Sequence, residues 1–525
     1  MRISIHRSST DSGAGWLNVT PTTPEKPREA NIASRSSGSA PSPAPSVSHS
    51  SLVGSVSYFG GVNLVAFAGG LIRQKVFAVY LGPSGLGAFG LAASFLELFT
   101  TLTRLGAPAG VLRELRQSFS EENWSKAARV FMDVRRITLL VAISLGVGVV
   151  FLGPVLDKYI FGGVVPRWSV LVLAIAAPLL LAGELCNSAI NALGRIRLMA
   201  VSNVTTVLLG LPVATWLVAT WGLTGAIVQL STGAFIAFLV AQGFLFRVFR
   251  PGEHRPDRVP RLEAGRAVAR AFRVGIAQAL HHLAMTGNFF VFRSLIVANM
   301  GTVANGLYQG TMALSRQYTI ALSGGLFVYL YPRLAARSGN LEGFSHELSR
   351  GLSFVLTVVV PIAIGLLAVR DWIVRMVFTA EFSPMVGLMA YSMLGDMVAI
   401  VGEVLKLALL ASGTARTYAM VGLVTEGLYL GAFALGLRVF GLRGAAGSYL
   451  VASLLALPIC GVVLIRRGQL KLSPRLVLQL VFAIPAVGIT TLAPLGVWTS
   501  RGLAIAVALV WVAAWRRELL SGCRY

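Results

Sequence analysis

Residues 183–197 read GELCNSAINALGRIR, and residues 402–416 read GEVLKLALLASGTAR. The second stretch follows the first at an offset of 219, and the two share six identical positions, including the opening Gly-Glu pair. At the same offset, GLTGA at 222–226 aligns with GLRGA at 441–445. Because apolar sequences match by accident but rarely at one constant offset, these stretches predict an internal duplication of the chain.

The composition limits the class of protein. The chain has 525 residues, of which 55% are hydrophobic and only 13% are charged, and its mean hydropathy is +0.73. A soluble domain carries about 25% charged residues, enough to cover its surface. We therefore exclude a soluble enzyme and predict an all-α, polytopic membrane protein.

The apolar stretches have the length of membrane-spanning helices, which is about 20 residues. We predict fourteen spans, near 53–76, 85–105, 137–156, 168–190, 200–220, 223–246, 274–298, 304–331, 352–369, 384–410, 418–438, 443–464, 476–494 and 499–515. The duplication makes the first twelve two copies of six. An even number of spans gives both copies the same orientation, with a substrate site between them. We expect two six-helix lobes around a central cavity, plus two C-terminal helices.

The charges set the expected topology and domain order. Lys and Arg outnumber Asp and Glu by 45 to 21, and most lie in segments on the same side as the N-terminus. Basic residues collect on the cytoplasmic side, so we expect both termini in the cytoplasm and no nucleic acid partner. The expected domains are a disordered cytoplasmic tail (1–50), the N-lobe (51–247), a basic cytoplasmic linker with a flexible hinge (248–273), the C-lobe (274–465), and the last two spans with a short tail (466–525).

The loops contain no catalytic constellation. Residues 111–136 resemble one amphipathic helix at the membrane interface. The three cysteines match no metal or redox spacing. We therefore predict no enzyme activity, no metal and no cofactor.

Glycine motifs carry a family resemblance. YLGPSGLGAFGLA at 80–92 is followed by LGAP at 105–108, and ANMGTVANGLYQGTMAL at 298–314 is followed by YPRLA at 331–335. This pattern resembles O-antigen and polysaccharide flippases of the Wzx type, which belong to the MOP (multidrug/oligosaccharidyl-lipid/polysaccharide) flippase superfamily with lipid II flippases and multidrug antiporters. The resemblance covers most of residues 52–515.

The resemblance implies a function. A flippase of this family would move an undecaprenyl-pyrophosphate-linked oligosaccharide from the inner to the outer leaflet of the cytoplasmic (inner) membrane by alternating access. The product would be O-antigen, capsule or exopolysaccharide. Membrane lipids and other polysaccharide-assembly proteins are the expected partners.

Four cations in or beside the spans are candidate ligands of the pyrophosphate. Arg73 and Lys75 lie in the first span, Arg293 in the seventh and Arg104 at the end of the second. Charges at membrane depth usually face a cavity or a partner, and Arg binds phosphate with two parallel hydrogen bonds. We expect Arg73 and Arg293 to face each other near the outer mouth. The resemblance also aligns Arg73 with a cavity arginine of lipid II flippases. The alternatives are snorkelling to the interface and, for Arg104, cytoplasmic anchoring.

Two further sets of charged residues suggest moving parts. Glu97 and Arg316 are separated by the same offset as the duplicated stretches, so they are repeat equivalents that can pair across the cavity as a gate, or else pair within their own lobes. Glu184, Asp396 and Glu403 are candidates for coupling to H⁺ or Na⁺. Glu403 can instead be neutralised by Lys406, one turn away on the same helix face.

Three functions compete. The first is a lipid-linked oligosaccharide flippase, and the second is an ion-coupled drug or cation antiporter of the same fold. The third is a membrane polysaccharide polymerase or glycosyltransferase. The cations in the first span favour an anionic substrate and hence the flippase. The short outer loops, without a pair of acids, argue against the third.

Overall fold

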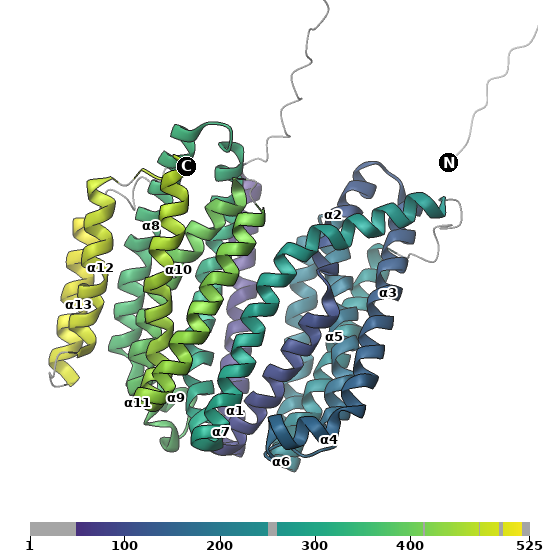
Figure 1. The fold of residues 1–525 in the computed structure, drawn as a ribbon, viewed down its shortest axis with the longest axis horizontal. Helices are drawn as coiled ribbons and strands as arrows, with labels where there is room; N and C mark the ends of the chain where they lie inside the picture. The colour runs from purple at the N-terminus through teal and green to yellow at the C-terminus, as the bar shows by residue number, and fades with distance from the viewer. Residues whose placement is uncertain (1–48, 250–259, 413–414, 472, 493–496, 517–525) are drawn as a thin grey trace, which may run out of the picture. The chain divides into compact units, whose positions relative to one another are not determined.

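The computed structural model describes residues 49–249, 260–412, 415–471, 473–492 and 497–516. Every regular element in these ranges is a helix (Figure 1). Most of the expected tail, part of the expected linker and the end of the chain from residue 517 lie outside the described residues. The predicted disorder of residues 1–50 therefore stays a prediction.

The helices follow the predicted order. The first repeat contains α1 (His49–Arg104), α2 (Ala107–Ser120), α3 (Trp124–Phe151), α4 (Gly153–Leu156), the π-helix Asp157–Phe161, α5 (Ser169–Ala192) and α6 (Ile196–Val248). The second repeat contains α7 (Arg261–Ala336), α8 (Leu341–Ala368), α9 (Arg370–Val377), the 3₁₀ helix Ala380–Phe382, α10 (Met385–Ala411) and α11 (Ala415–Arg466). Two more helices follow, α12 (Pro474–Leu492) and α13 (Val497–Ala514).

The helix bounds confirm the duplication. The first residues of α6 and α11 are separated by the offset of the duplicated stretches, and so are the last residues of α5 and α10. The four longest helices, α1, α6, α7 and α11, each contain a break. Counting the parts of these four separately, and adding α3, α5, α8, α10, α12 and α13, gives fourteen long segments in the described ranges. This is the number that the apolar pattern predicts.

The breaks occur at glycines that are repeat equivalents. Gly82 has φ 59° and Gly301 has φ 81°, while Gly222 has φ 54° and Gly441 has φ 60°. A side chain at such a φ clashes with the following carbonyl, so glycine is the residue that can turn the chain there. Each pair is separated by the same repeat offset, which places the same turn at the same point of both repeats.

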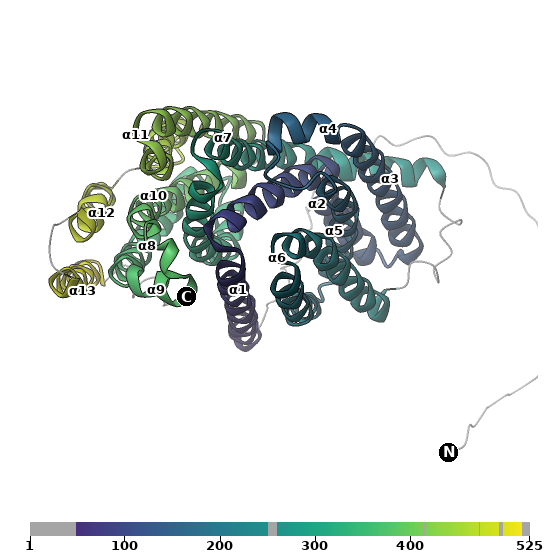
Figure 2. The ribbon, with the colours of Figure 1, turned by 90° about the horizontal axis from the view of Figure 1, so that it is seen from below.

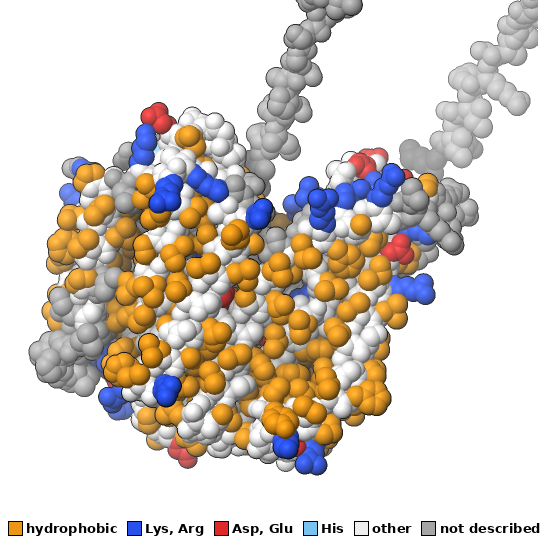
Figure 3. Space-filling model, in the orientation of Figure 1, with side chains coloured by type: hydrophobic (Ala, Val, Ile, Leu, Met, Phe, Trp, Pro, Cys, Tyr) orange, Lys and Arg blue, Asp and Glu red, His pale blue; other side chains and the backbone are white. Residues whose placement is uncertain are grey.

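The surface has the character of a membrane protein. Seven helices in the described part of the chain are long and apolar enough to cross a bilayer, and α12 and α13 contain shorter apolar stretches. Figure 3 shows hydrophobic side chains along the lengths of the helices, with Lys and Arg gathered near their ends. Water would not tolerate so much exposed apolar surface on a soluble monomer. The protein is an integral membrane protein with many spans.

The helices of each repeat pack mainly on one another. Helices α2, α3, α5 and α6 are neighbours, and so are α8, α10 and α11. Helix α7 contacts helices of both repeats and lies between the two groups in Figures 1 and 2. Helices α12 and α13 pack against α8 (Figure 2), where the buried Gln479 amide donates to Thr357 Oγ1 over 3.2 Å.

The single interfacial helix predicted at 111–136 is wrong. The structure has two helices there, because α2 ends at Ser120 and α3 begins at Trp124. Glu122 adopts φ 54°, and the Asn123 side chain accepts a hydrogen bond from the Lys126 backbone N–H as the α3 N-cap. The amphipathic pattern continues across the turn, but asparagine in this position begins a new helix.

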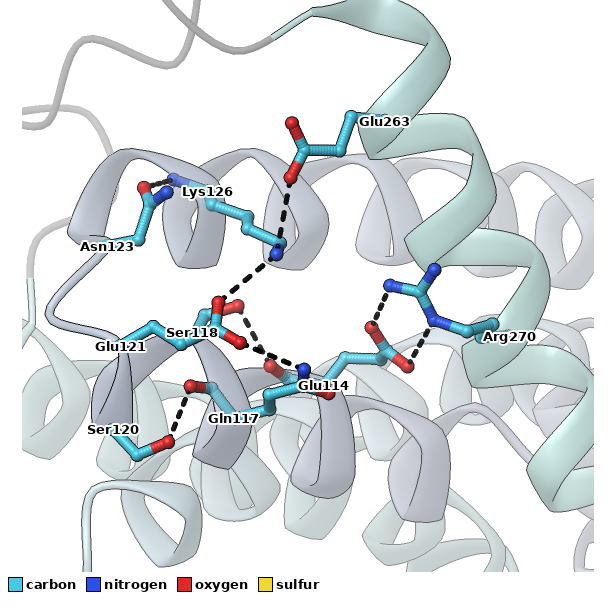
Figure 4. Close-up of polar contacts among 9 residues, drawn as sticks. All are labelled: Glu114, Gln117, Ser118, Ser120, Glu121, Asn123, Lys126, Glu263 and Arg270. Carbon is cyan, nitrogen blue, oxygen red and sulfur yellow. Dashed lines mark hydrogen bonds and ion pairs between the residues drawn. The ribbon is translucent and has the colours of Figure 1, made fainter. Parts of the chain in front are cut away.

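The expected linker contains the first turns of α7, which begins at Arg261. Ala267 and Ala271 are fully buried against α2 and α3. The Arg270 guanidinium donates two hydrogen bonds to the Glu114 carboxylate, over 3.1 and 2.9 Å, and the Lys126 ammonium lies 3.3 Å from a Glu263 carboxylate oxygen (Figure 4). The described part of the predicted hinge is therefore a helix that is anchored on the first repeat.

Candidate functional site

The repeats meet near the breaks of α1 and α7. Gly87 and Gly306 are repeat equivalents, and each lies so close to the other helix that a side chain would clash with its backbone. The hydroxyls of Ser84 and Thr302 are 2.8 Å apart, and the Asn305 amide donates to the Gly87 carbonyl over 2.7 Å. We call these five residues the kink-end contact.

A second contact joins the repeats where α1 ends. The backbones of Gly106 and Gly275 touch, so that a methyl group on Gly106 would lie 2.5 Å from the Gly275 backbone. Arg104 forms an ion pair with Glu184 of α5, and its Nη1 lies 3.4 Å from His282 Nε2 of α7. We call Arg104, Gly106, Gly275 and His282 the α2-end contact. Both contacts are closed in this conformation.

A cavity of about 360 Å³ opens beside the α2-end contact. Its polar lining includes Arg104, Glu184, His281, His282 and Tyr418, so residues of α1, α5, α7 and α11 meet around it. The side chains of Arg104 and Glu184 are 24% and 36% exposed. Their ion pair is therefore accessible from the cavity rather than sealed in the protein.

The predicted cations lie in different environments. Arg293 is 8% exposed, and a methyl group on Gly90 of α1 would come within 2.5 Å of its Nη1. Arg73 is exposed on α1. The Lys75 ammonium donates to the Phe378 carbonyl over 2.7 Å, so it joins α1 to the segment after α9. Arg293 thus reaches the other repeat, and the facing of Arg73 and Arg293 stays a prediction.

The proposed gate pair can be followed on one side only. Glu97 lies half-buried in the second part of α1, close enough to Glu184 for their charges to interact. The Arg316 side chain lies outside the described residues. The pairing of Glu97 with Arg316 therefore stays a prediction.

The second repeat holds a cavity of about 430 Å³. Asp396 is 3% exposed and accepts a hydrogen bond from Ser315 Oγ. Glu403 and Lys406 form the ion pair that their spacing predicts. This cavity shares His281, His282 and Tyr418 with the cavity at the α2-end contact, so the two cavities adjoin.

Sequence reasoning missed two parts of this arrangement. Glu426 also lines the larger cavity, and it accepts hydrogen bonds of 2.8 Å from the Asn288 amide through both Oε2 and its backbone oxygen. A carboxylate inside the predicted span 418–438 was the available signal. The Arg104–Glu184 pair was the other omission, because its partners are 80 residues apart and carry no spacing signal.

The larger cavity carries mostly acidic side chains among the residues that the structure describes. Asp396, Glu403 and Glu426 contribute carboxylates to this part of the lining, and Lys406 contributes an ammonium. Among the described residues, no cluster of His, Cys, Asp and Glu has the arrangement to hold a metal ion. The arginines that reach from one repeat to the other, Arg104 and Arg293, lie outside its lining.

Solved structures share this fold. The chain resembles the lipid II flippase MurJ in an inward closed conformation, with a TM-score of 0.66 and 13% identity over 89% of this chain and 100% of that chain. It also resembles an inward-facing multidrug resistance MATE transporter of the MOP superfamily, with a TM-score of 0.61 and 15% identity over 77% of this chain and 94% of that one. The predicted polytopic fold is confirmed.

A curated relative is more similar in sequence. The chain is 24% identical to the Lipid III flippase of Escherichia coli (strain K12) over 411 residues, which cover 77% of this chain and 96% of the relative. At the level of family and fold, the expected class of transporter rather than enzyme is confirmed, since these relatives are flippases and transporters. The resemblance to the MOP flippase superfamily is confirmed as well.

The family model for "Polysaccharide biosynthesis protein" matches residues 76–387, which run from α1 through the break of α7 into α10 and make up more than half of the chain. The match therefore includes both inter-repeat contacts described above. The chain belongs to this polysaccharide biosynthesis protein family.

Proposed function

We propose that the protein is a flippase that moves a polyprenyl-pyrophosphate-linked oligosaccharide from the inner to the outer leaflet of the cytoplasmic membrane. It would work by alternating access and would supply cell-surface polysaccharide synthesis. The family match and the similarity to a Lipid III flippase support a lipid-linked substrate. An undecaprenyl carrier with a pyrophosphate head is the form that we propose.

One observation carries the proposal most strongly. Arginines of both repeats lie at the interface between them, because Arg104 of α1 contacts His282 of α7 and Arg293 of α7 abuts Gly90 of α1. Planar guanidinium groups bind phosphate oxygens in pairs. Fourteen residues of α1 separate Gly90 from Arg104, roughly 21 Å along a helix, so a pyrophosphate that moves between the repeats would meet the two arginines in turn, while the lipid tail stays in the bilayer.

We also propose the orientation. Exposed arginines gather at the α2 end, including Arg113 and Arg116 of α2 and Arg266 of α7, and Figure 3 shows Lys and Arg over this region. Cytoplasmic segments carry such an excess of basic residues. The α2 end would face the cytoplasm with both termini, and the kink end would face the outside of the membrane.

The test is deletion of the gene followed by lipid analysis. We expect polyprenyl-linked repeat units to accumulate on the inner leaflet. Complementation with Arg104→Gln or Arg293→Gln should restore little transport, while Arg116→Gln, on the exposed face of α2, should restore it fully. Unchanged lipid intermediates in the deletion strain would contradict the proposal.

A cation antiporter, or a flippase coupled to H⁺ or Na⁺, is the second candidate. The acidic cavity of the second repeat supports it, because Asp396 lies buried there beside Glu403 and Glu426. Membrane carboxylates of this kind relay protons or bind cations. Flipping of the lipid-linked substrate in vesicles with imposed Na⁺ or proton gradients would test the coupling of a flippase, and drug sensitivity of the deletion strain with unchanged lipids would favour the antiporter.

A further inference from the structure

The ion pair between Arg104 and Glu184 differs from a purely structural ion pair, because a ligand in the adjoining cavity can reach it. It joins the end of α1 to α5 and lies on the wall of the cavity at the α2-end contact. Both side chains keep part of their surface exposed, 24% for Arg104 and 36% for Glu184. A ligand in the cavity can therefore reach the guanidinium while the carboxylate is already bound to it.

A carboxylate and a phosphate use the same hydrogen-bonding edge of a guanidinium. The two anions therefore compete for Arg104. Since Glu184 is fixed to the same protein, it competes at a high effective concentration, on the order of millimolar or above. Glu184 holds the Nη2 donor of Arg104, so a phosphate group that takes both hydrogen bonds of this edge displaces the carboxylate.

We propose that Glu184 is a built-in competitor that occupies Arg104 before the substrate pyrophosphate arrives and takes the arginine back when the pyrophosphate leaves. The inference rests on the proposed function, because it takes pyrophosphate as the ligand of Arg104. It assigns Arg104 and Glu184, which the sequence places in separate roles, to one exchange.

The surroundings of the pair favour the return of Glu184. The charge of Glu97 lies close enough to repel the Glu184 carboxylate, so Glu184 is disfavoured while it is displaced from Arg104. His281, His282 and Tyr418 line the same cavity, and His282 Nε2 lies 3.4 Å from Arg104. The exchange would therefore take place where the two repeats meet.

Such a competitor has a use in transport. A site that holds the substrate in its ground state too tightly lowers turnover, because release becomes slow. A carboxylate that takes the arginine back weakens binding and speeds release. Removing it should lower both the KM and the kcat of flipping.

The first measurement is binding of inorganic pyrophosphate to the purified full-length protein by calorimetry. Glu184→Gln keeps the shape of the side chain without its charge. We expect it to bind pyrophosphate about tenfold more tightly than the unmodified protein, which equals about 1.4 kcal/mol. Arg104→Gln and the double variant should both lose this binding. Asp133→Asn removes another carboxylate of the first repeat, which pairs with Arg129 on α3, and should leave the affinity unchanged.

The second measurement is flipping of a fluorescent short-chain polyprenyl pyrophosphate in proteoliposomes. For Glu184→Gln we expect a lower KM together with a lower kcat. A merely structural carboxylate would give a lower melting temperature with unchanged or weaker pyrophosphate binding, and that result overturns the inference. Tighter binding that persists in the double variant overturns it too.

The experiments distinguish a failure of this inference from a failure of the proposed flippase function. Pyrophosphate binding that depends on Arg104 but is unaffected by Glu184→Gln would contradict the competitor role of Glu184. It would leave the proposed flippase function standing. If neither the unmodified protein nor Glu184→Gln binds pyrophosphate, the inference falls. The accumulation of lipid intermediates in the deletion strain then decides the flippase proposal by itself.

Discussion

The hydroxyls of Ser84 and Thr302 lie 2.8 Å apart, one from α1 and one from α7. Each closely follows a break glycine, Gly82 in α1 and Gly301 in α7. The kink-end contact is thus formed by corresponding segments of the two repeats. Alternating access requires this contact and the α2-end contact to open in turn.

A disulfide between these two positions should stop transport. The two hydroxyl oxygens lie at hydrogen-bond distance, so cysteines at these positions would be neighbours, and a disulfide forms where their Cβ atoms approach to about 3.5–4.5 Å. We expect the double variant Ser84→Cys/Thr302→Cys to lose transport after oxidation, because the kink end cannot open, and to recover it with a reductant. The measurement is complementation of the deletion strain, or flipping in proteoliposomes, before and after reduction.

The single variants Ser84→Cys and Thr302→Cys are the controls, and both should stay active under oxidation. The native cysteines Cys186 and Cys460 are buried and should not interfere, and Cys523, which lies outside the described residues, is replaced by serine in all variants. Full transport by a protein shown to be cross-linked would mean that the kink end does not open.

The close approach of Gly306 to α1 gives a second prediction. A methyl group at this position would clash with the Pro83 carbonyl of α1, which is backbone and cannot rotate away. Overpacking of this kind costs about 1–3 kcal/mol, so we expect Gly306→Ala to lower the melting temperature in detergent. Gly210→Ala in α6 is the control, because a methyl group there meets nothing within 4 Å. Equal melting temperatures for the two variants would show that the repeats separate freely here.

The ion pair of Glu114 with Arg270 should respond unequally to loss of its two members. Glu114 is 5% exposed and Arg270 is 49% exposed, and the carboxylate raises the pKa of the Arg270 guanidinium by accepting its hydrogen bonds. Arg270→Gln leaves a buried carboxylate without its cation, which costs about 1–3 kcal/mol. Glu114→Gln leaves an arginine that water can solvate, at a cost of about 0.2–1 kcal/mol.

Thermal unfolding of the two variants checks this difference. We expect the larger drop in melting temperature for Arg270→Gln. Equal drops, or a larger one for Glu114→Gln, would show that Glu114 is solvated and does not anchor the start of α7 on α2.

The sequence was sufficient for the architecture because the relevant signals are local or periodic. Apolar length predicts the spans, and the constant offset between matching stretches predicts the two repeats. The same offset places the breaks, since a glycine with positive φ occurs at both Gly82 and Gly301. The helix at 111–136 failed, because amphipathic periodicity continues across the short turn at 121–123.

The site was less predictable, because it depends on contacts between distant residues. The i,i+3 spacing predicted the pair of Glu403 and Lys406. No spacing relates Arg104 to Glu184, or Glu114 to Arg270 156 residues later. Membrane charges could be identified one by one, but which of them meet is decided by the packing of α1, α5 and α7.

The turn between α2 and α3 gives a prediction about pH. The Glu121 carboxylate accepts a hydrogen bond of 2.9 Å from the Gln117 amide and lies 3.3 Å from the Lys126 ammonium. These two partners, Gln117 first, hold the pKa of Glu121 below its ordinary value of 4.5. A carboxyl group whose pKa is lower in the folded state stabilises the fold above its unfolded pKa, and the contribution is lost as the pH falls through the folded value.

We therefore expect Glu121→Gln to lower the melting temperature slightly at neutral pH, with the difference from the unmodified protein disappearing well below pH 4.5. Melting curves from neutral pH down to about pH 3 check this, with Glu122→Gln as the control, because Glu122 is exposed beside Glu121. A difference that stays constant over the whole range would mean that packing, rather than the charge of Glu121, produces the effect.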